Sequence, residues 1–121
     1  MDKKVFNEWF IKLGEAWSEK NPQKIRPLFS EELEYFESVF EDPVKTLDGV
    51  MALWEVVPLN QDNVNYDFKL IATDEDIAIA NWEVSRTLLK TNENQHIDGI
   101  FMIKLDENGQ CYYFKQWRAV K

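Results

Sequence analysis

Few residues in this sequence have side chains suited to chemistry, and they form no recognised catalytic motif. His96 is the only histidine, and it lies two residues before Asp98. Residues two apart on a β-strand share a face, and a His–Asp pair on one face can act as an oriented base. Strand parity, however, places the pair on the face opposite to that of Phe101, and only a bulge at Gly99 would turn it inward. A polar strand end beside a turn is the alternative interpretation of this pair.

Neither a metal nor a cofactor is expected. One histidine and one cysteine, Cys111, are too few for a zinc site with its usual ligands. The sequence also lacks a glycine-rich phosphate loop and any nucleotide-binding motif. A ligand would therefore be held by ordinary side chains.

Two arginines and an amide form the second polar group, namely Arg86, Arg118 and Gln116. Strand parity, described below, places all three on the inner face of a sheet. Guanidinium and amide groups can together bind a carboxylate or a polarised carbonyl. Alternatively, the arginines pair with Glu or Asp at the mouth of the fold, because a buried unpaired arginine is costly.

Three helices and a run of strands must position these groups. Helical spacing of apolar residues predicts a first helix over residues 5–17, and capping signals predict a short second helix over residues 22–28. A short strand or extended arm over residues 34–40 comes next. A third helix, capped by Thr46 or Asp48, is expected up to residue 57 and closed by Pro58.

The second half of the chain predicts antiparallel strands over residues 64–70, 77–89, 97–105 and 111–120. Residues 106–109 contain Asn-Gly, the strongest hairpin signal present, because these residues accept the positive φ of tight turns. Helices followed by antiparallel strands indicate an α+β fold.

Both faces of the predicted sheet are apolar. Parity about the hairpin puts Phe101, Gln116 and Arg118 on the inner face, and Trp82 is the better inner candidate on its own strand. The outer face takes Cys111 and the apolar residues Ile100, Met102, Tyr113 and Trp117. Because three helices can cover only one face, we expect a homodimer through the outer one. The alternative is that Lys104 and Lys115 keep that face hydrated.

Composition narrows the class of protein. The chain has 121 residues, 45% of them hydrophobic and 14% aromatic with five Trp, which suits one globular domain over residues 1–121. A net charge of -8 without a basic cluster argues against nucleic acid and anionic membrane surfaces. No apolar run approaches a membrane span, and a single cysteine fits a reducing compartment. We therefore expect a soluble, cytoplasmic protein.

Several segments, in this order, resemble SnoaL-like proteins of the nuclear-transport-factor-two-like superfamily. They are Ala16-Trp17-Ser18-Glu19-Lys20-Asn21, Leu28-Phe29-Ser30-Glu31-Glu32-Leu33-Glu34-Tyr35, Val50-Met51-Ala52-Leu53-Trp54, the stretch from His96 to Gly109, and Phe114-Lys115-Gln116-Trp117-Arg118. The resemblance implies a curved mixed or antiparallel sheet forming a conical half-barrel on three N-terminal helices, with a small-molecule pocket and usually a homodimer. Such proteins include ketosteroid isomerases, polyketide cyclases, epoxide hydrolases, dehydratases and non-catalytic binding proteins.

Carried onto this sequence, the resemblance puts Glu37 near the position of an isomerase's catalytic base. Leu13 stands where the isomerase has a tyrosine, and Phe101 where it has a protonated aspartate, so isomerase chemistry of that type is not expected. A carboxylate among aromatic residues would have its neutral form favoured. The alternative is an ordinary exposed acid.

Two functions, and a third possibility, follow from these residues. The first is a small-molecule-binding protein for an apolar or carboxylate- or carbonyl-bearing ligand, with a pocket lined by Trp9, Leu13, Trp54, Trp82 and Phe101 and polarity set by Arg86, Gln116 and Arg118. The alternative is a cofactor-independent isomerase, polyketide cyclase or hydrolase with Glu37 or Asp98 as general base. The third is an interaction module that works only through its outer sheet face. Plain core packing also explains the aromatic residues.

Overall fold

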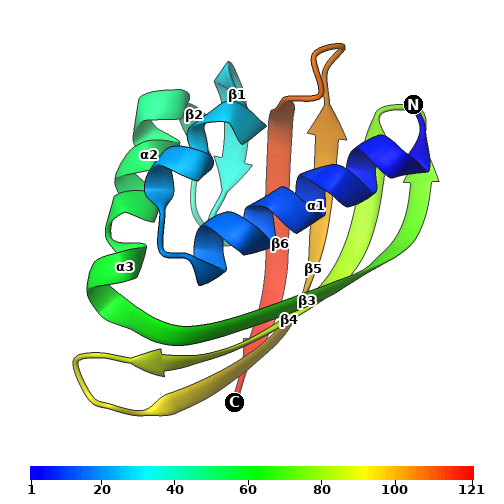
Figure 1. The fold of residues 1–121 in the computed structure, drawn as a ribbon. Coiled ribbons are helices and arrows are strands. Elements are labelled where there is room, and N and C mark those ends of the chain that lie inside the picture. The colour runs from blue at the N-terminus through cyan, green and yellow to red at the C-terminus, as the bar shows by residue number, and fades with distance from the viewer.

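A computed structural model describes residues 1–121 as a six-stranded curved sheet with its helices on the concave side (Figure 1). The strand order is β2-β1-β6-β5-β4-β3, in which β1 runs parallel to β6 and all other neighbours are antiparallel. The helices are α1 (Lys3–Ser18), α2 (Leu47–Glu55) and α3 (Val57–Asn60), and the strands are β1 (Phe29–Phe36), β2 (Val44–Thr46), β3 (Gln61–Asp74), β4 (Ile77–Leu88), β5 (Asn94–Leu105) and β6 (Cys111–Val120). The predicted α+β fold with an open, mixed sheet is confirmed.

Helix α1 crosses the concave face, as its apolar spacing predicts (Figure 1). Asp2 caps it by accepting a hydrogen bond from the Lys4 amide at 3.0 Å. Phe6, Phe10 and Leu13 lie on one side of the helix at intervals of three and four residues, and all three are fully buried. This side of α1 forms the centre of the core.

Prolines explain where the other helices differ from prediction. The second predicted helix is two 3-10 turns, Pro22–Lys24 and Arg26–Leu28, because Pro27 cannot continue an α-helix begun before it. Of the two candidate caps, Thr46 caps α2, and Asp48 lies in the first turn of the helix. Pro58 does not close that helix, which ends at Glu55, but lies in the first turn of the short helix α3, where its missing N–H costs nothing.

Strand β1 begins at Phe29, earlier than predicted, and ends at Phe36. Pairing with β6 starts at once, with Phe29 opposite Cys111 and Phe36 opposite Lys115. The chain then leaves the sheet, so the predicted extended arm stops short, and Phe40 is 96% exposed.

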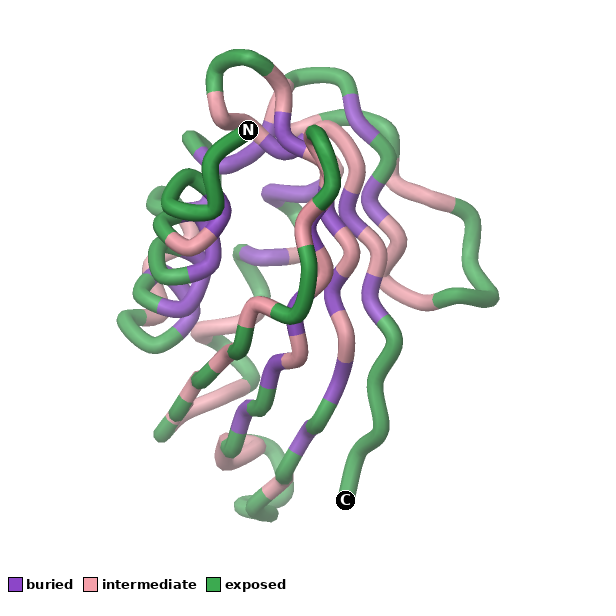
Figure 2. The backbone as a smooth tube through the Cα atoms, turned by 90° about the vertical axis from the view of Figure 1, so that its right-hand side faces the viewer, coloured by how far each residue is buried: buried purple, intermediate pink, exposed green.

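The sheet register confirms the predicted parity over most of the last two hairpins. Trp82 lies opposite Gly99, which lies opposite Arg118, and Phe101 lies opposite Gln116. Burial alternates along β4, and Figure 2 shows the same alternation along the neighbouring strands. The face that carries Trp82 is the inner one.

Cys111 departs from that parity and needs a correction. Leu105 pairs with Cys111 whereas Lys104 pairs with Tyr113, so a bulge at Tyr112 turns Cys111 inward. Cys111 is fully buried, and its thiol donates a hydrogen bond to the Tyr113 carbonyl at 3.0 Å. Burial raises the pKa of this thiol far above its ordinary value. It is therefore a core residue rather than a surface one.

Aromatic rings fill the space between α1 and the sheet. The Trp82 and Phe101 rings stack at 4.6 Å between centroids, and Phe10 stacks on Phe101 at 6.1 Å. Such pairs add to the stability that burial alone provides. None of the helices combines the length and apolar character needed to span a bilayer.

Candidate functional site

A cleft of about 190 Å³ opens beyond the end of this core. One wall comes from α2 and α3, and the other from β4, β5 and β6, with further residues from α1, β1 and β3. Six of the predicted site residues line it: Glu37, Trp54, Arg86, Phe101, Gln116 and Arg118.

The cleft walls are aromatic but include an unused polar group. Trp54, Phe101 and Phe114 are among its apolar lining residues. Trp54 is only 7% exposed, and its buried indole N–H has no acceptor in hydrogen-bonding geometry, although the Tyr35 hydroxyl lies close to it. A buried donor without an acceptor is uncommon, and the Tyr35 hydroxyl is the neighbouring group that can serve as its acceptor.

The polar groups gather at the rim. Gln116 Nε2 donates to the Glu37 carbonyl at 2.9 Å, which holds the segment after β1 against β6. Arg118 Nη1 lies 3.7 Å from Glu37 Oε1, an ion pair without a close hydrogen bond. Arg86 donates from Nε and Nη2 to Gln95 Oε1 at 3.1 and 2.9 Å. Two guanidinium groups therefore share the rim with one carboxylate.

Burial dominates the electrostatics of this rim. It raises the pKa of the Glu37 carboxyl, and the positive charge of Arg118 only partly opposes the rise. Burial also lowers the pKa of Arg86, and the like charge of Arg118 acts in the same direction. The pKa of Tyr35 is raised well above its ordinary value, chiefly by burial. The cleft thus has an excess of one positive charge in a partly desolvated place.

Three predicted lining residues need a correction. Trp9, Leu13 and Trp82 do not line the cleft, since they pack within the core beneath α1. Trp82 is covered by its stack on Phe101, and Trp9 Nε1 donates to the Leu28 carbonyl at 2.9 Å. Of the predicted aromatic lining residues, Trp54 and Phe101 line the cleft.

His96 and Asp98 lie on the outer face, away from the cleft. They are exposed and sit opposite Ser85 and Glu83 on β4, in a pairing with no bulge at Gly99 to turn them inward. Asn81 Nδ2 donates to Asp98 Oδ1 at 2.7 Å. The structure therefore removes Asp98 as a candidate base in the cleft and leaves Glu37.

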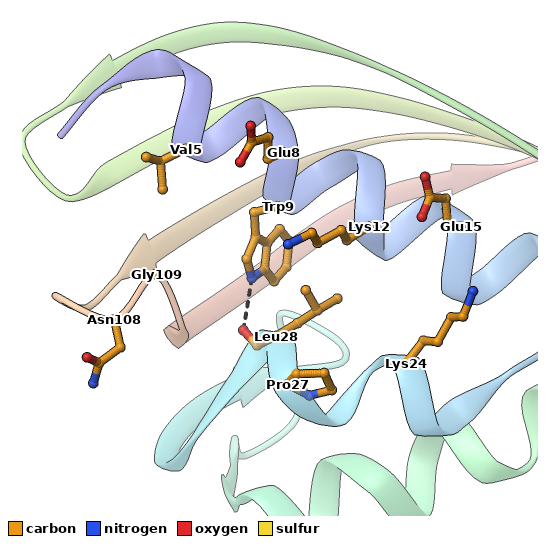
Figure 3. Close-up of a pocket in the computed structure, with 10 residues that line it drawn as sticks. All are labelled: Val5, Glu8, Trp9, Lys12, Glu15, Lys24, Pro27, Leu28, Asn108 and Gly109. Carbon is orange, nitrogen blue, oxygen red and sulfur yellow. Dashed lines mark hydrogen bonds between the residues drawn. The ribbon is translucent and has the colours of Figure 1, made fainter.

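A larger hollow, of about 460 Å³, lies between α1 and the segment that contains Pro27 and Leu28 (Figure 3). Its rim carries charged side chains of α1, among them Glu8, Lys12 and Glu15, and its floor is Trp9 bonded to Leu28. The indole N–H there already has its acceptor, and no buried polar group faces the hollow unsatisfied. The smaller cleft is chemically the better equipped of the two. No group of His, Cys, Asp or Glu side chains on the chain is arranged to hold a metal ion.

Sequence reasoning missed several cleft residues, Tyr35 and Leu53 among them. One signal was present for Tyr35, because Leu33, Tyr35 and Glu37 alternate with exposed or half-exposed neighbours and so share a face. No comparable signal marked the wall from α3, since a one-turn helix has too few residues to show a period.

Comparison with solved structures agrees with this architecture. TsrD from Streptomyces laurentii superposes with a TM-score of 0.81 at 12% identity, over 98% of this chain and 90% of that chain. A protein from Bacillus subtilis gives 0.84 at 12% identity over the same shares. SalBIII, an epoxide hydrolase/cyclase-like enzyme with a role in pyran ring formation in the polyether salinomycin, gives 0.80 at 14% identity, over 98% and 92%. At such low identity these likenesses concern the fold alone.

The sequence itself matches a family model. The match is to the SnoaL-like domain and extends over residues 11–114, from the second half of α1 to the start of β6. No curated protein matches the sequence significantly. Fold, strand order and sequence match agree, and the chain belongs to the SnoaL-like family.

Proposed function

We propose that this protein binds a small, largely apolar molecule bearing a carboxylate or carbonyl group in the cleft between α2–α3 and the sheet. The observation that supports it is the pair of guanidinium groups, Arg86 and Arg118, facing one carboxylate, Glu37, at the rim of an aromatic cleft. Partly buried charges are unfavourable unless they are paired. An anionic or strongly polarised oxygen would compensate the surplus positive charge.

The remaining features of the cleft limit what the ligand can be. Its volume of about 190 Å³ is below the roughly 300–1,000 Å³ typical of drug-sized ligands, which favours a molecule of one ring with a short side chain. Trp54 and Phe101 offer flat apolar surface to such a ring. The planar guanidinium groups would bind its oxygen atoms.

A matched ligand series tests this proposal. Isothermal titration with 3-phenylpropionate, its amide and the corresponding alcohol should give affinities in that order. Arg118→Gln and Arg86→Gln should each lower the affinity for 3-phenylpropionate about 10- to 100-fold, which is the range for losing a charged hydrogen bond. Neither variant should change the affinity for the alcohol much.

Lys12→Gln is the control, because it removes one positive charge beside the larger hollow of Figure 3. It should leave binding of the carboxylate unchanged. If Lys12→Gln weakens binding while Arg118→Gln does not, the ligand occupies the other hollow and the proposal is wrong.

A second candidate function is acid–base catalysis by Glu37, as a cofactor-independent isomerase, polyketide cyclase or hydrolase. It is favoured by one observation: Glu37 lines the cleft and has a pKa raised by burial, which suits a carboxylate that must exchange protons. Leu13 and Phe101 are both buried and apolar, so any oxyanion would have to be held by the arginines. The chemistry would differ in that respect from a ketosteroid isomerase.

Proton abstraction can be tested without knowing the product. Phenylacetone in D₂O should exchange the hydrogens next to its carbonyl faster with the protein than without it, as followed by NMR. Glu37→Gln should abolish this acceleration yet keep ligand binding. If phenylacetone binds but its exchange is not accelerated, Glu37 is no base toward this class of ligand and only the binding function remains.

We also propose that the protein works in the reducing environment of the cytoplasm. Its one cysteine is unpaired and fully buried, so no disulfide contributes to the fold. Fractionation of cells that produce the protein would test this, and recovery outside the cytoplasm would contradict it.

A further inference from the structure

Three buried polar atoms of the side chains have no hydrogen-bond partner in the chain, namely Trp54 Nε1, Tyr66 Oη and Trp82 Nε1. The rings of all three pack against Trp17, with centroid distances of 5.6, 6.1 and 5.7 Å. Such groups are rare in folded proteins, because each has given up its hydrogen bonds to water. Trp54 has the Tyr35 hydroxyl close by, which leaves Tyr66 and Trp82 as two donors that the fold itself does not use.

The ring of Trp17 stands between these two donors and the cleft. Trp17 is one of the residues that line the cleft, whereas neither Tyr66 nor Trp82 lines it. The same ring packs against both of them. If the Trp17 ring left its place, the cleft of about 190 Å³ would extend inward to the Tyr66 hydroxyl and the Trp82 indole N–H.

Tyr66 and Trp82 are held firmly by their surroundings. A Cβ on Gly14 of α1 would overlap the Tyr66 ring, so this ring lies directly against the helix backbone. Trp82 stacks on Phe101 at 4.6 Å between ring centroids, and its Nε1 lies 2.7 Å from where a Cβ on Gly99 would stand. Burial raises the pKa of Tyr66 far above its ordinary value, so its hydroxyl keeps its proton. Both groups are therefore fixed donors.

Trp17 is held by fewer contacts of this kind. It is the penultimate residue of α1, which ends at Ser18. Its Nε1 donates one hydrogen bond, to Gln61 Oε1 at 3.0 Å, and Gln61 is the first residue of β3 and also lines the cleft. The Trp17 ring can therefore turn about its own side-chain bonds at the cost of this hydrogen bond and its ring contacts, without a movement of the sheet.

We propose that the Trp17 ring turns aside when a ligand binds, and that a second oxygen atom of the ligand then reaches an inner subsite formed by the Tyr66 hydroxyl and Trp82 Nε1. This inner subsite rests on the proposed function, because the carboxylate or carbonyl group of the ligand stays at the arginine rim. An indole N–H only donates, whereas a tyrosine hydroxyl donates or accepts, so a hydroxyl or ketone oxygen suits the pair. The ligand class is a ring compound with a carboxylate or carbonyl at one end and a hydroxyl or ketone at the other.

Two acids that differ only at the far end of the ring test the inner subsite. Isothermal titration with 3-phenylpropionate and 3-(4-hydroxyphenyl)propionate should show about 10-fold tighter binding of the hydroxylated acid, the range for a hydrogen bond formed in a buried site. Tyr66→Phe should remove this advantage and leave the affinity for 3-phenylpropionate unchanged. A variant that only disturbed the packing would weaken both acids alike.

Tyr113→Phe is the matched control, since it removes a hydroxyl from the outer face of the sheet, where Tyr113 lies opposite Lys104. It should change neither affinity. Tyr66→Phe loses no internal hydrogen bond, because Tyr66 Oη has no partner, and should therefore be as stable as the native protein. Circular dichroism confirms that each variant is folded.

The movement of Trp17 has a readout of its own. Binding of the hydroxylated acid, followed by stopped-flow tryptophan fluorescence, should reach a limiting rate at high concentration in the native protein, because the turn of the ring then sets the rate. Trp17→Phe has a smaller ring and no hydrogen bond to Gln61, so its binding rate should keep rising over the same range. The remaining tryptophans, among them Trp54 and Trp82, report binding in this variant.

The outcomes distinguish the inner subsite from the proposed function. If the native protein binds neither acid, the proposed function fails and the inner subsite with it. If 3-phenylpropionate binds but the added hydroxyl brings no gain, or the gain survives in Tyr66→Phe, only the inner subsite is wrong. A native binding rate that never reaches a limit would mean that Trp17 does not turn aside. The result expected is a gain that Tyr66→Phe removes, with a limiting rate in the native protein and none in Trp17→Phe.

Discussion

The two ends of the inner sheet face differ in what covers them. At one end, the 16-residue helix α1 lies over the sheet and its buried side chains pack against the sheet in the core. At the other end, α3 has only four residues, and the same sheet face opens into a cleft. The strands are continuous between the ends: β4 carries Trp82 into the filled end and Arg86 into the open one. A hollow arises here because the helical cover is short, not because the strands change.

Residue type follows this division. Along β6, buried Phe114 is followed on the same face by Gln116 and then by Arg118, so polarity increases toward the open end. Solvent and a ligand can satisfy polar groups there, whereas beneath α1 they would have no partners. Residues beneath α1 therefore stabilise the fold, whereas polar residues at the open end are available to bind a ligand.

Truncating a leucine at each end should have the largest and most unequal effect. Leu13→Ala should lower the free energy of unfolding by roughly 2–5 kcal/mol, because Leu13 is fully buried under α1 and the site cannot collapse easily. Leu53→Ala, in the cleft wall, should cost about 1 kcal/mol, since water already reaches that space. Urea denaturation measures both, and equal losses would contradict the division into a filled and an open end.

A smaller effect is expected where the filled end has no room for one methyl group. A Cβ on Gly99 would lie 2.4 Å from the Trp117 carbonyl oxygen and 2.7 Å from Trp82 Nε1, and the backbone oxygen cannot move away. Gly99→Ala should therefore cost about 3 kcal/mol. Gly109→Ala is the control: its Cβ meets nothing, and only the positive φ of 75° opposes it, at about 1 kcal/mol. If both substitutions cost the same, packing around Trp82 is looser than described.

The sequence predicts the faces of the sheet better than it predicts the hollow. Because alternation is a local property, the sequence alone predicts that Arg86, Gln116 and Arg118 share the inner face. The structure places all three around one cleft. The bulge that buries Cys111 has no such local signal, because it depends on how one hairpin pairs.

Pocket lining was the weakest part of the prediction. Whether Trp82 faces a cavity or a filled core depends on Phe10 and Phe101, which come from α1 and β5 and meet it only in the folded chain. Sequence spacing predicts which side chains face the interior, but it does not predict which side chains from other elements fill the space beside them. Glu37 could be suggested from the family resemblance, whereas Tyr35 beside it was recognised only in the structure.

The smallest expected effect concerns the charge of Glu37 at the open end. An unfolded glutamate has a pKa of about 4.3, and burial raises that of Glu37 in the folded protein. Just above pH 4.3 the folded state therefore binds more protons than the unfolded state, so this carboxyl lowers stability as pH rises through the folded pKa. The Glu37→Gln variant does not lose stability in this way. Its melting temperature should therefore be slightly above that of the native protein at pH 7 and no higher than it at pH 4.

Thermal unfolding at a series of pH values measures this difference. Glu107→Gln removes the same charge from an exposed turn and corrects for the change in net charge. The side chain of Glu37 is 37% exposed, so solvent screens it and the shift is small. A variant that melts lower than the native protein at pH 7 would mean that the Arg118 ion pair outweighs burial. Arg118 would then already be satisfied by Glu37, and the excess positive charge of the cleft would rest on Arg86 alone.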